Sequence, residues 1–153
     1  MKAKALVVDK WVNCKDGYEL DVEGPGIKII HAFQMLCPGC VYRGIPQNIE
    51  LYKKYNSENV IVVGLHTVFE NHHAMTPDCL DVFIKEWRLP FPIGIDKRIE
   101  GNKIPETMKA YQLQGTPSLI IIDHLGDIQL QHFGYIEQEN LETFIDHLIN
   151  NMT

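Results

Sequence analysis

Two cysteines separated by two residues, in the stretch Cys37-Pro38-Gly39-Cys40, have the type and spacing needed for redox chemistry. A helix beginning near Pro38 would place unpaired N–H groups and the positive end of its dipole beside Cys37, and both favour the nucleophilic thiolate. Cys40 would lie one helical turn away, where it can attack a mixed disulfide formed at Cys37. Pro38 suits a first helical position, because the backbone donor that it lacks is not needed there. The spacing predicts a reversible dithiol.

Composition limits the class of protein. The chain has 153 residues, of which 45% are hydrophobic, and it has no apolar run of membrane length, so we expect one domain over residues 1–153 and no membrane partner. The early apolar run Ala5–Val8 is too short for a signal-peptide core, which favours the cytosol. In a reducing compartment such a cysteine pair is more often catalytic or metal-binding than a structural crosslink. The net charge of -6, with no basic cluster, argues against nucleic acid as a partner.

The elements that must position the dithiol follow from hydrophobic periodicity. The strongest signals are the nearly continuous apolar runs before the cysteines and at Asn59–His66, which are typical of strands buried on both faces of a sheet. We predict strands at residues 3–12, 28–33, 59–66, 91–96, 118–123 and 128–133, and helices at 38–55, 76–87, 105–112 and 137–150. Alternating β and α elements followed by a terminal hairpin and helix predict an α/β sandwich with a mixed sheet.

The helix after the dithiol contains Pro46, which should kink it by removing a backbone donor. Its apolar face is predicted from residues at helical spacing, which are Val41, Ile45, Ile49 and Tyr52.

This order of elements resembles the thioredoxin fold, with C-x-x-C at a strand-to-helix junction and Gly115-Thr116-Pro117 opening a later buried strand. Within that fold the chain resembles the TlpA/ResA-like redoxins, relatives of the AhpC/TSA peroxiredoxins. Four features carry this closer resemblance: Trp11-Val12-Asn13, the stretch FQMLCPGC, Pro46, and the extra β and α material between His66 and Pro117. The resemblance implies a thioredoxin-like α/β fold, with a central mixed sheet flanked by helices and a β/α insertion before the strand that follows Pro117.

The resemblance also implies roles at the site. Cys37 would attack a disulfide, Cys40 would resolve the mixed disulfide, and the Thr116-Pro117 bond would be cis and face them. A cis proline exposes the preceding backbone, so Thr116 could pair with an extended substrate segment. The other residues expected to contact substrate are Pro38, Gly39, Met35 and His66.

His31 departs from the thioredoxin pattern, which has a buried acid six residues before the first cysteine. A histidine there could transfer the proton during resolution, nearer neutral pH. The alternative is a core histidine whose nitrogens bond to the backbone.

A second departure concerns peroxide. Peroxiredoxins carry P-x-x-x-T-x-x-C, and here Ile30 and Gln34 replace the proline and the threonine. Because that threonine hydroxyl helps to bind peroxide, the pattern favours dithiol exchange, and a thiol-dependent peroxidase is the alternative.

A metal site is a further alternative. Five residues in or near the loop after the 59–66 strand could complete a zinc or copper site with the dithiol, namely His66, Glu70, His72, His73 and Cys79. Their spacing matches no standard zinc pattern, so a loop with incidental histidines is favoured and no metal is expected. Cys14 and Cys79 are expected to be small buried hydrophobic residues.

The sequence thus predicts a cytosolic thiol-disulfide oxidoreductase that acts on protein or small-molecule disulfides. Its partner would be an upstream thiol reductant, and it would need no cofactor other than the Cys37–Cys40 disulfide. A metallochaperone that uses the C-x-x-C with nearby histidines is the remaining alternative.

Overall fold

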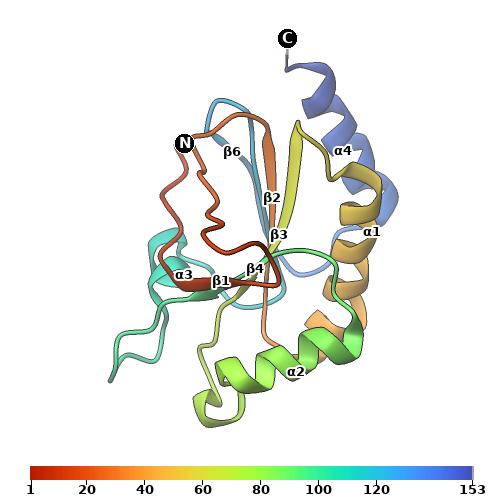
Figure 1. Ribbon diagram of the computed structural model, residues 1–153. Coiled ribbons are helices and arrows are strands. Elements are labelled where there is room, and N and C mark those ends of the chain that lie inside the picture. Colours follow the sequence, from red (N-terminus) through yellow and green to blue (C-terminus); the bar gives the residue numbers. More distant parts are fainter. Residues whose placement is uncertain (153) are drawn as a thin grey trace.

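The computed structural model describes residues 1–152, which are built around one six-stranded mixed sheet (Figure 1). The strand order is β1-β4-β3-β2-β5-β6. Central strand β2 pairs in parallel with β3 and antiparallel with β5. The strands are β1 (Val8–Val12), β2 (Ile27–Phe33), β3 (Val60–His66), β4 (Ile93–Asp96), β5 (Ser118–Ile122) and β6 (Ile128–Phe133). The predicted thioredoxin-like fold with a mixed sheet is confirmed.

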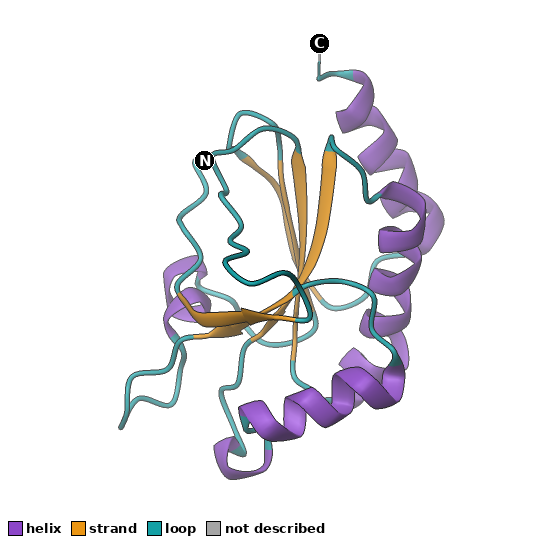
Figure 2. Cartoon of the chain, viewed as in Figure 1, coloured by secondary structure: helices purple, strands orange, loops and turns teal. Residues whose placement is uncertain are grey.

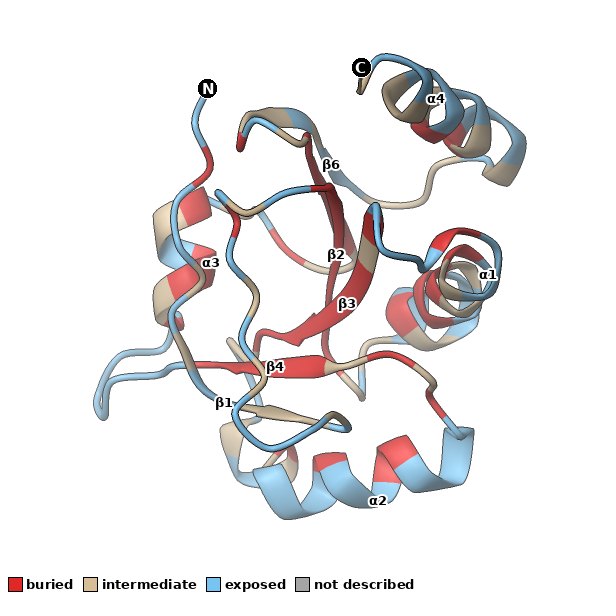
Figure 3. Cartoon of the chain, turned by 45° about the horizontal axis from the view of Figure 1, so that its top comes forward, coloured by how far each residue is buried: buried red, intermediate tan, exposed pale blue. Residues whose placement is uncertain are grey.

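Strand β2 is buried along its whole length, because helices cover both faces of the sheet (Figure 3). Its register with β3 places Phe33 opposite His66, so both strands end at the same edge. The segments that follow them, one carrying the dithiol and the other the histidine-rich loop, therefore leave the sheet side by side.

The helical elements lie on both sides of the sheet (Figure 2). In Figure 1, α1 and α4 lie side by side on one face and α3 lies on the other. The α1–α4 contact includes a hydrogen bond of 2.9 Å from the Tyr55 hydroxyl to Asp146. The elements are a π-helix η1 (Cys40–Gly44), α1 (Ile45–Tyr55), a 3₁₀ turn η2 (His72–Ala74), α2 (Pro77–Trp87), α3 (Glu106–Tyr111) and α4 (Gln138–Asn150). Within residues 1–152, none of these helices is long and apolar enough to cross a membrane.

The first strand is shorter than the sequence predicted. Only Val8–Val12 forms β1, and it pairs with β4 at the edge of the sheet. Because β4 has only four residues, it offers no ladder to residues 3–7. Lys2 instead forms an isolated bridge with Asp127.

The predicted helix over residues 38–55 has two parts. Helical backbone begins at Pro38, as expected, but residues 40–44 form a π turn in which Ile45 N–H donates to the Cys40 carbonyl. A wider turn ahead of Pro46 accommodates a residue that has no N–H to donate. The predicted kink is therefore a π turn.

The buried face of α1 overlaps the predicted one. Its fully buried residues are Ile45, Asn48, Leu51 and Tyr55, whereas Ile49 and Tyr52 are only partly buried. The predicted face is confirmed in part, because Val41, Ile49 and Tyr52 pack against the core without being fully buried.

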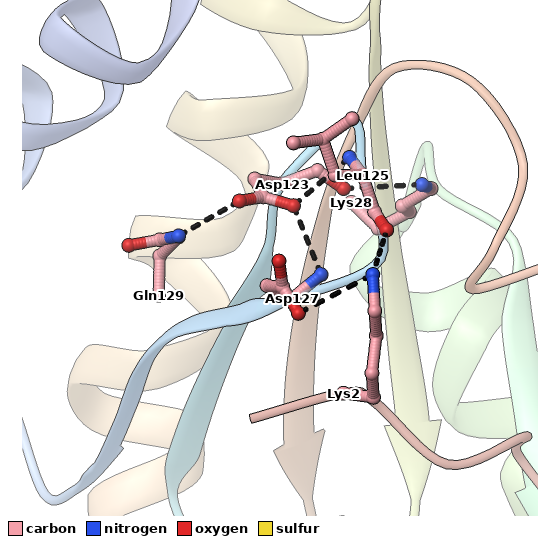
Figure 4. A network of polar contacts seen from close by, with 6 residues as sticks. All are labelled: Lys2, Lys28, Asp123, Leu125, Asp127 and Gln129. Carbon is pink, nitrogen blue, oxygen red and sulfur yellow. Dashed lines mark hydrogen bonds and ion pairs between the residues drawn. The ribbon is translucent and has the colours of Figure 1, made fainter.

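A polar network closes the end of the sheet opposite the dithiol (Figure 4). Lys28, on β2, is fully buried, and its ammonium group donates to the carbonyls of Gly24 and Asp123. Burial lowers the pKa of Lys28. The Asp123 carboxylate accepts hydrogen bonds of 2.7–2.9 Å from Leu125 N, Asp127 N and Gln129 Nε2.

Candidate active site

The dithiol lies where the chain passes from β2 into the helical stretch. Both thiols are free, with Cys37 half-buried and Cys40 completely buried. The Cys37 amide donates to the Gln34 carbonyl at 3.0 Å, and the Cys37 carbonyl accepts from Val41 N–H at 3.0 Å. Cys37 is therefore the cap of the helical stretch, with Pro38 in the first helical position as predicted.

The two thiols have different environments. Burial raises the pKa of Cys40 to about 12, and a hydrogen bond with Cys37 acts in the same direction. Cys40 is therefore a neutral thiol at physiological pH. The half-buried Cys37 is the sulfur that a partner can reach.

Thr116 and Pro117 face the dithiol across the site. The bond between them is cis, and the Cys37 thiol lies 3.5 Å from the Thr116 carbonyl oxygen, to which it donates. A Cβ added to Gly39 would lie 3.4 Å from Pro117 Cδ, which shows how closely the helical turn approaches the proline. The structure thus brings together Cys37, Gly39, Thr116 and Pro117.

His31 lies beneath the helical stretch. Its side chain is 3% exposed, its ring stacks on Phe33 with 5.9 Å between centroids, and a Cβ on Gly44 would overlap its Nε2. Burial lowers the pKa of His31 to about 4. Among the described residues neither ring nitrogen has a hydrogen-bond partner, so the backbone-bonded alternative does not describe this ring. Gly44 is four residues beyond Cys40, so the ring packs against the turn that begins at Cys40.

His66 supports the segment that precedes the dithiol. It is 2% exposed, and its Nε2 accepts a hydrogen bond of 3.2 Å from the half-buried Met35 amide. Burial lowers the pKa of His66 to about 4, so the ring is neutral and its proton is on Nδ1. The substrate contacts assigned to Met35 and His66 stay predictions.

Gln34 is a positioning residue that the sequence pattern indicated only as a departure from peroxiredoxins. It is 1% exposed, its side-chain oxygen accepts from Phe69 N–H at 3.1 Å, and its amide nitrogen donates to Glu70 at 3.3 Å. These bonds connect the loop after β3 to the residues before Cys37. A polar residue directly after a strand with a long apolar run was the available signal.

The remaining histidines and cysteines are dispersed. His72 Nε2 lies 3.0 Å from the Lys103 carbonyl, and His73 is exposed. Within residues 1–152 no group of three or more His, Cys, Asp or Glu side chains is arranged to hold a metal ion.

The two cysteines outside the dithiol differ from expectation. Cys79 is exposed, contrary to the prediction, because the buried face of α2 is formed by Leu80, Phe83 and Ile84. Cys14 is half-buried in a loop.

Solved structures resemble this geometry over nearly the whole chain. The crystal structure of a thioredoxin-like superfamily protein is 43% identical, has a TM-score of 0.90, and matches 97% of this chain and 96% of its own. A thiol-disulfide isomerase from Corynebacterium glutamicum is 40% identical with a TM-score of 0.90, and the match covers 97% of this chain and 95% of that one.

Curated relatives are more distant. The thiol-disulfide oxidoreductase ResA of Halalkalibacterium halodurans is 26% identical over 126 residues, which are 82% of this chain but only 64% of ResA. The sporulation thiol-disulfide oxidoreductase A of Bacillus subtilis is 25% identical over 132 residues, which are 86% of this chain and 74% of the relative. No family model matches the chain. From its fold, its dithiol and these relatives, the chain belongs to the thioredoxin-like superfamily, in its TlpA/ResA-like redoxin branch.

Proposed function

We propose that the protein reduces disulfide bonds through Cys37 and Cys40. The observation that carries the proposal is the pairing of unequal thiols: Cys37 is half-buried beside the Thr116 carbonyl, and Cys40 is buried one turn away with a pKa of about 12. An accessible sulfur can attack first, and an enclosed sulfur can attack only what is bound to the first.

The reaction has two exchanges. The Cys37 thiolate attacks one sulfur of the substrate disulfide, forming a Cys37–substrate disulfide and releasing the other substrate sulfur as a thiolate, which takes up a proton. Cys40 then loses its proton and attacks the Cys37 sulfur, which breaks the mixed disulfide and releases the second substrate thiol. The substrate gains two electrons, and the protein is left with a Cys37–Cys40 disulfide. A dithiol reductant restores the starting state, and we propose that this takes place in the cytosol.

His31 is the proposed acceptor for the Cys40 proton. Its pKa of about 4 keeps the ring neutral and able to accept at physiological pH, and its nitrogens have no other partner among the described residues. The low pKa also makes it a weaker base than the sequence suggested, so transfer must accompany attack by Cys40 and cannot precede it.

Reduction of insulin disulfides with dithiothreitol as the electron donor tests the proposal. We expect Cys37→Ser to abolish catalysis and Cys40→Ser to accumulate a mixed disulfide that is detectable by mass. Consumption of hydrogen peroxide without insulin reduction would instead support the peroxidase alternative. Stoichiometric zinc or copper lost on replacing both cysteines would support a metal-binding module.

The His31 role has its own test. We expect His31→Ala to slow release of the second substrate thiol at least tenfold, while the first exchange, followed by stopped flow, stays within twofold of wild type. An equal effect on both steps would contradict a role in resolution.

A further inference from the structure

A groove with aromatic walls lies along η1 and α1 and begins two residues after Cys40. Its volume is about 470 Å³, with Tyr42, Arg43, Pro46, Gln47 and Glu50 on one wall and Tyr135 and Gln138 on the other. The second wall belongs to the segment that connects β6 to α4. We call this feature the Tyr42 groove.

Both walls of the Tyr42 groove continue into the redox site. Tyr42 follows Cys40 by two residues in the same π turn. On the other wall, Tyr135 follows Gly134, whose amide donates to the Pro117 carbonyl at 2.8 Å. A chain whose cysteine is bound to Cys37 therefore lies at the end of the helical stretch along which the groove runs.

The separation between Cys37 and Tyr42 is within the reach of an extended polypeptide. Tyr42 is five residues beyond Cys37, a rise of about 7.5 Å along the helix axis at about 1.5 Å per residue. An extended chain covers about 3.3 Å per residue, so a substrate must continue at least two or three residues past its reacting cysteine to reach the groove.

The lining has the chemistry of a peptide-binding surface. Tyr42 is 80% exposed, so its ring has little role in packing the core. The Arg43 guanidinium lies over the Tyr135 ring, 4.8 Å from its centroid, which holds a flat, positively charged face beside Tyr42. Tyrosine and arginine are the residue types that contribute most at protein interfaces.

We propose that the Tyr42 groove binds the polypeptide segment next to the reacting cysteine of a protein disulfide, through an apolar side chain seated against Tyr42. This inference rests on the proposed function, and it makes protein disulfides better substrates than small disulfides, which end before the groove.

The test compares kcat/KM for insulin with kcat/KM for 5,5′-dithiobis(2-nitrobenzoic acid). We expect Tyr42→Ala to lower the ratio of the two constants about five- to tenfold, mainly through a higher KM for insulin; a tenfold change is about 1.4 kcal/mol. Tyr42→Phe keeps the apolar ring and should keep the ratio within twofold of wild type. Leu125→Ala is the matched control, because Leu125 is 61% exposed and lies at the opposite end of the sheet.

A wild-type ratio in Tyr42→Ala would overturn the groove as a peptide site, as would an equal fall in Leu125→Ala. Failure of the wild-type protein to reduce either disulfide would be a different result, because it would reject the proposed function itself.

Discussion

Cys37 and Cys40 are three residues apart, but they differ in what can reach them. Cys40 is 0% exposed and its pKa is raised to about 12, whereas Cys37 is half-buried at the start of the helical stretch. The fold therefore distinguishes two chemically identical side chains by burial, and the proposed order of the two exchanges rests on this difference.

Alkylation should report that difference directly. In the reduced protein at pH 7.5 we expect iodoacetamide to modify Cys37 at least tenfold faster than Cys40, because only the thiolate reacts and Cys40 is both neutral and enclosed. Peptide mass mapping over time gives both rates, and 6 M guanidinium chloride should make them similar. Equal rates in the folded protein would contradict the assigned order.

The buried histidines should make stability depend on pH. In the unfolded chain each ring takes up a proton near pH 6.5, whereas burial lowers the pKa of both His31 and His66 to about 4 in the folded protein. Between these values the unfolded state binds more protons, so the free energy of unfolding falls as pH drops from about 6.5 to about 4. The loss is roughly 3 kcal/mol per ring over the full window, at 1.36 kcal/mol per pKa unit. Urea titrations at several pH values measure it.

His66→Gln provides the comparison for that titration. Its side-chain oxygen can still accept from the Met35 amide, but it binds no proton, so the pH dependence should fall to about half. An unchanged slope would mean that His66 does not contribute to it.

At the residue scale, the sequence was enough to predict those features of the site that depend on residue type and spacing alone. The dithiol and Pro38 at the helix start followed from local pattern, and the roles of Thr116 and Pro117 followed from the resemblance. The low pKa of His31 could not be predicted, because it depends on burial beneath the turn that contains Gly44, which reaches the ring only in the folded chain. Cys79 was placed wrongly because one cysteine carries no periodic signal of its own.

At the scale of elements, Gly44 is what allows the π turn to pack directly on the His31 ring. A Cβ on Gly44 would overlap His31 Nε2, lie 2.7 Å from Cε1, and lie 3.2 Å from Pro117 Cβ. No side chain larger than hydrogen fits between the turn and the ring.

Gly44→Ala should therefore lower the free energy of unfolding by about 1–3 kcal/mol, the usual effect of overpacking a closed core. Gly39→Ala is the control: it has similar helical backbone angles, and its Cβ would make only an ordinary 3.4 Å contact with Pro117. Combining Gly44→Ala with His31→Ala should recover part of the loss in urea denaturation. Strictly additive effects would show that the ring is not what excludes the methyl group.

Most elements could be predicted because hydrophobic periodicity is a local property. The β6 bounds matched, and β2, β3 and β5 were each within one residue. The π turn could not be seen, because Pro46 indicates an interruption but not whether the chain bends or widens a turn to accommodate it.

At the scale of the whole molecule, the dithiol lies at one end of the sheet and a buried polar network lies at the other. The dithiol follows the carboxyl end of β2, and the Lys28–Asp123 network closes the other end (Figure 4). Burial alone would raise the pKa of Asp123, but its hydrogen bonds outweigh burial and the pKa is lowered.

Asp123→Ala should thus destabilise the protein by about 1–3 kcal/mol, because it leaves two turn amides and Gln129 without their acceptor. The stability that this carboxylate contributes is present above its unfolded pKa and is lost as pH falls through the folded one. The Cys37–Cys40 reduction potential, measured against glutathione, should stay at the wild-type value because the network is at the other end of the sheet. A large shift in potential would show that the two ends are coupled.

The burial of Lys28 determines how readily its amine can be chemically modified. An amine with no solvent exposure cannot meet a dissolved acylating reagent, although lysines on the surface react freely. Acetylation of Lys28 must wait until this end of the sheet opens and frees the ammonium group from the Gly24 and Asp123 carbonyls. The rate at which acetylated Lys28 appears in a mass spectrum would therefore measure the rate of that local opening.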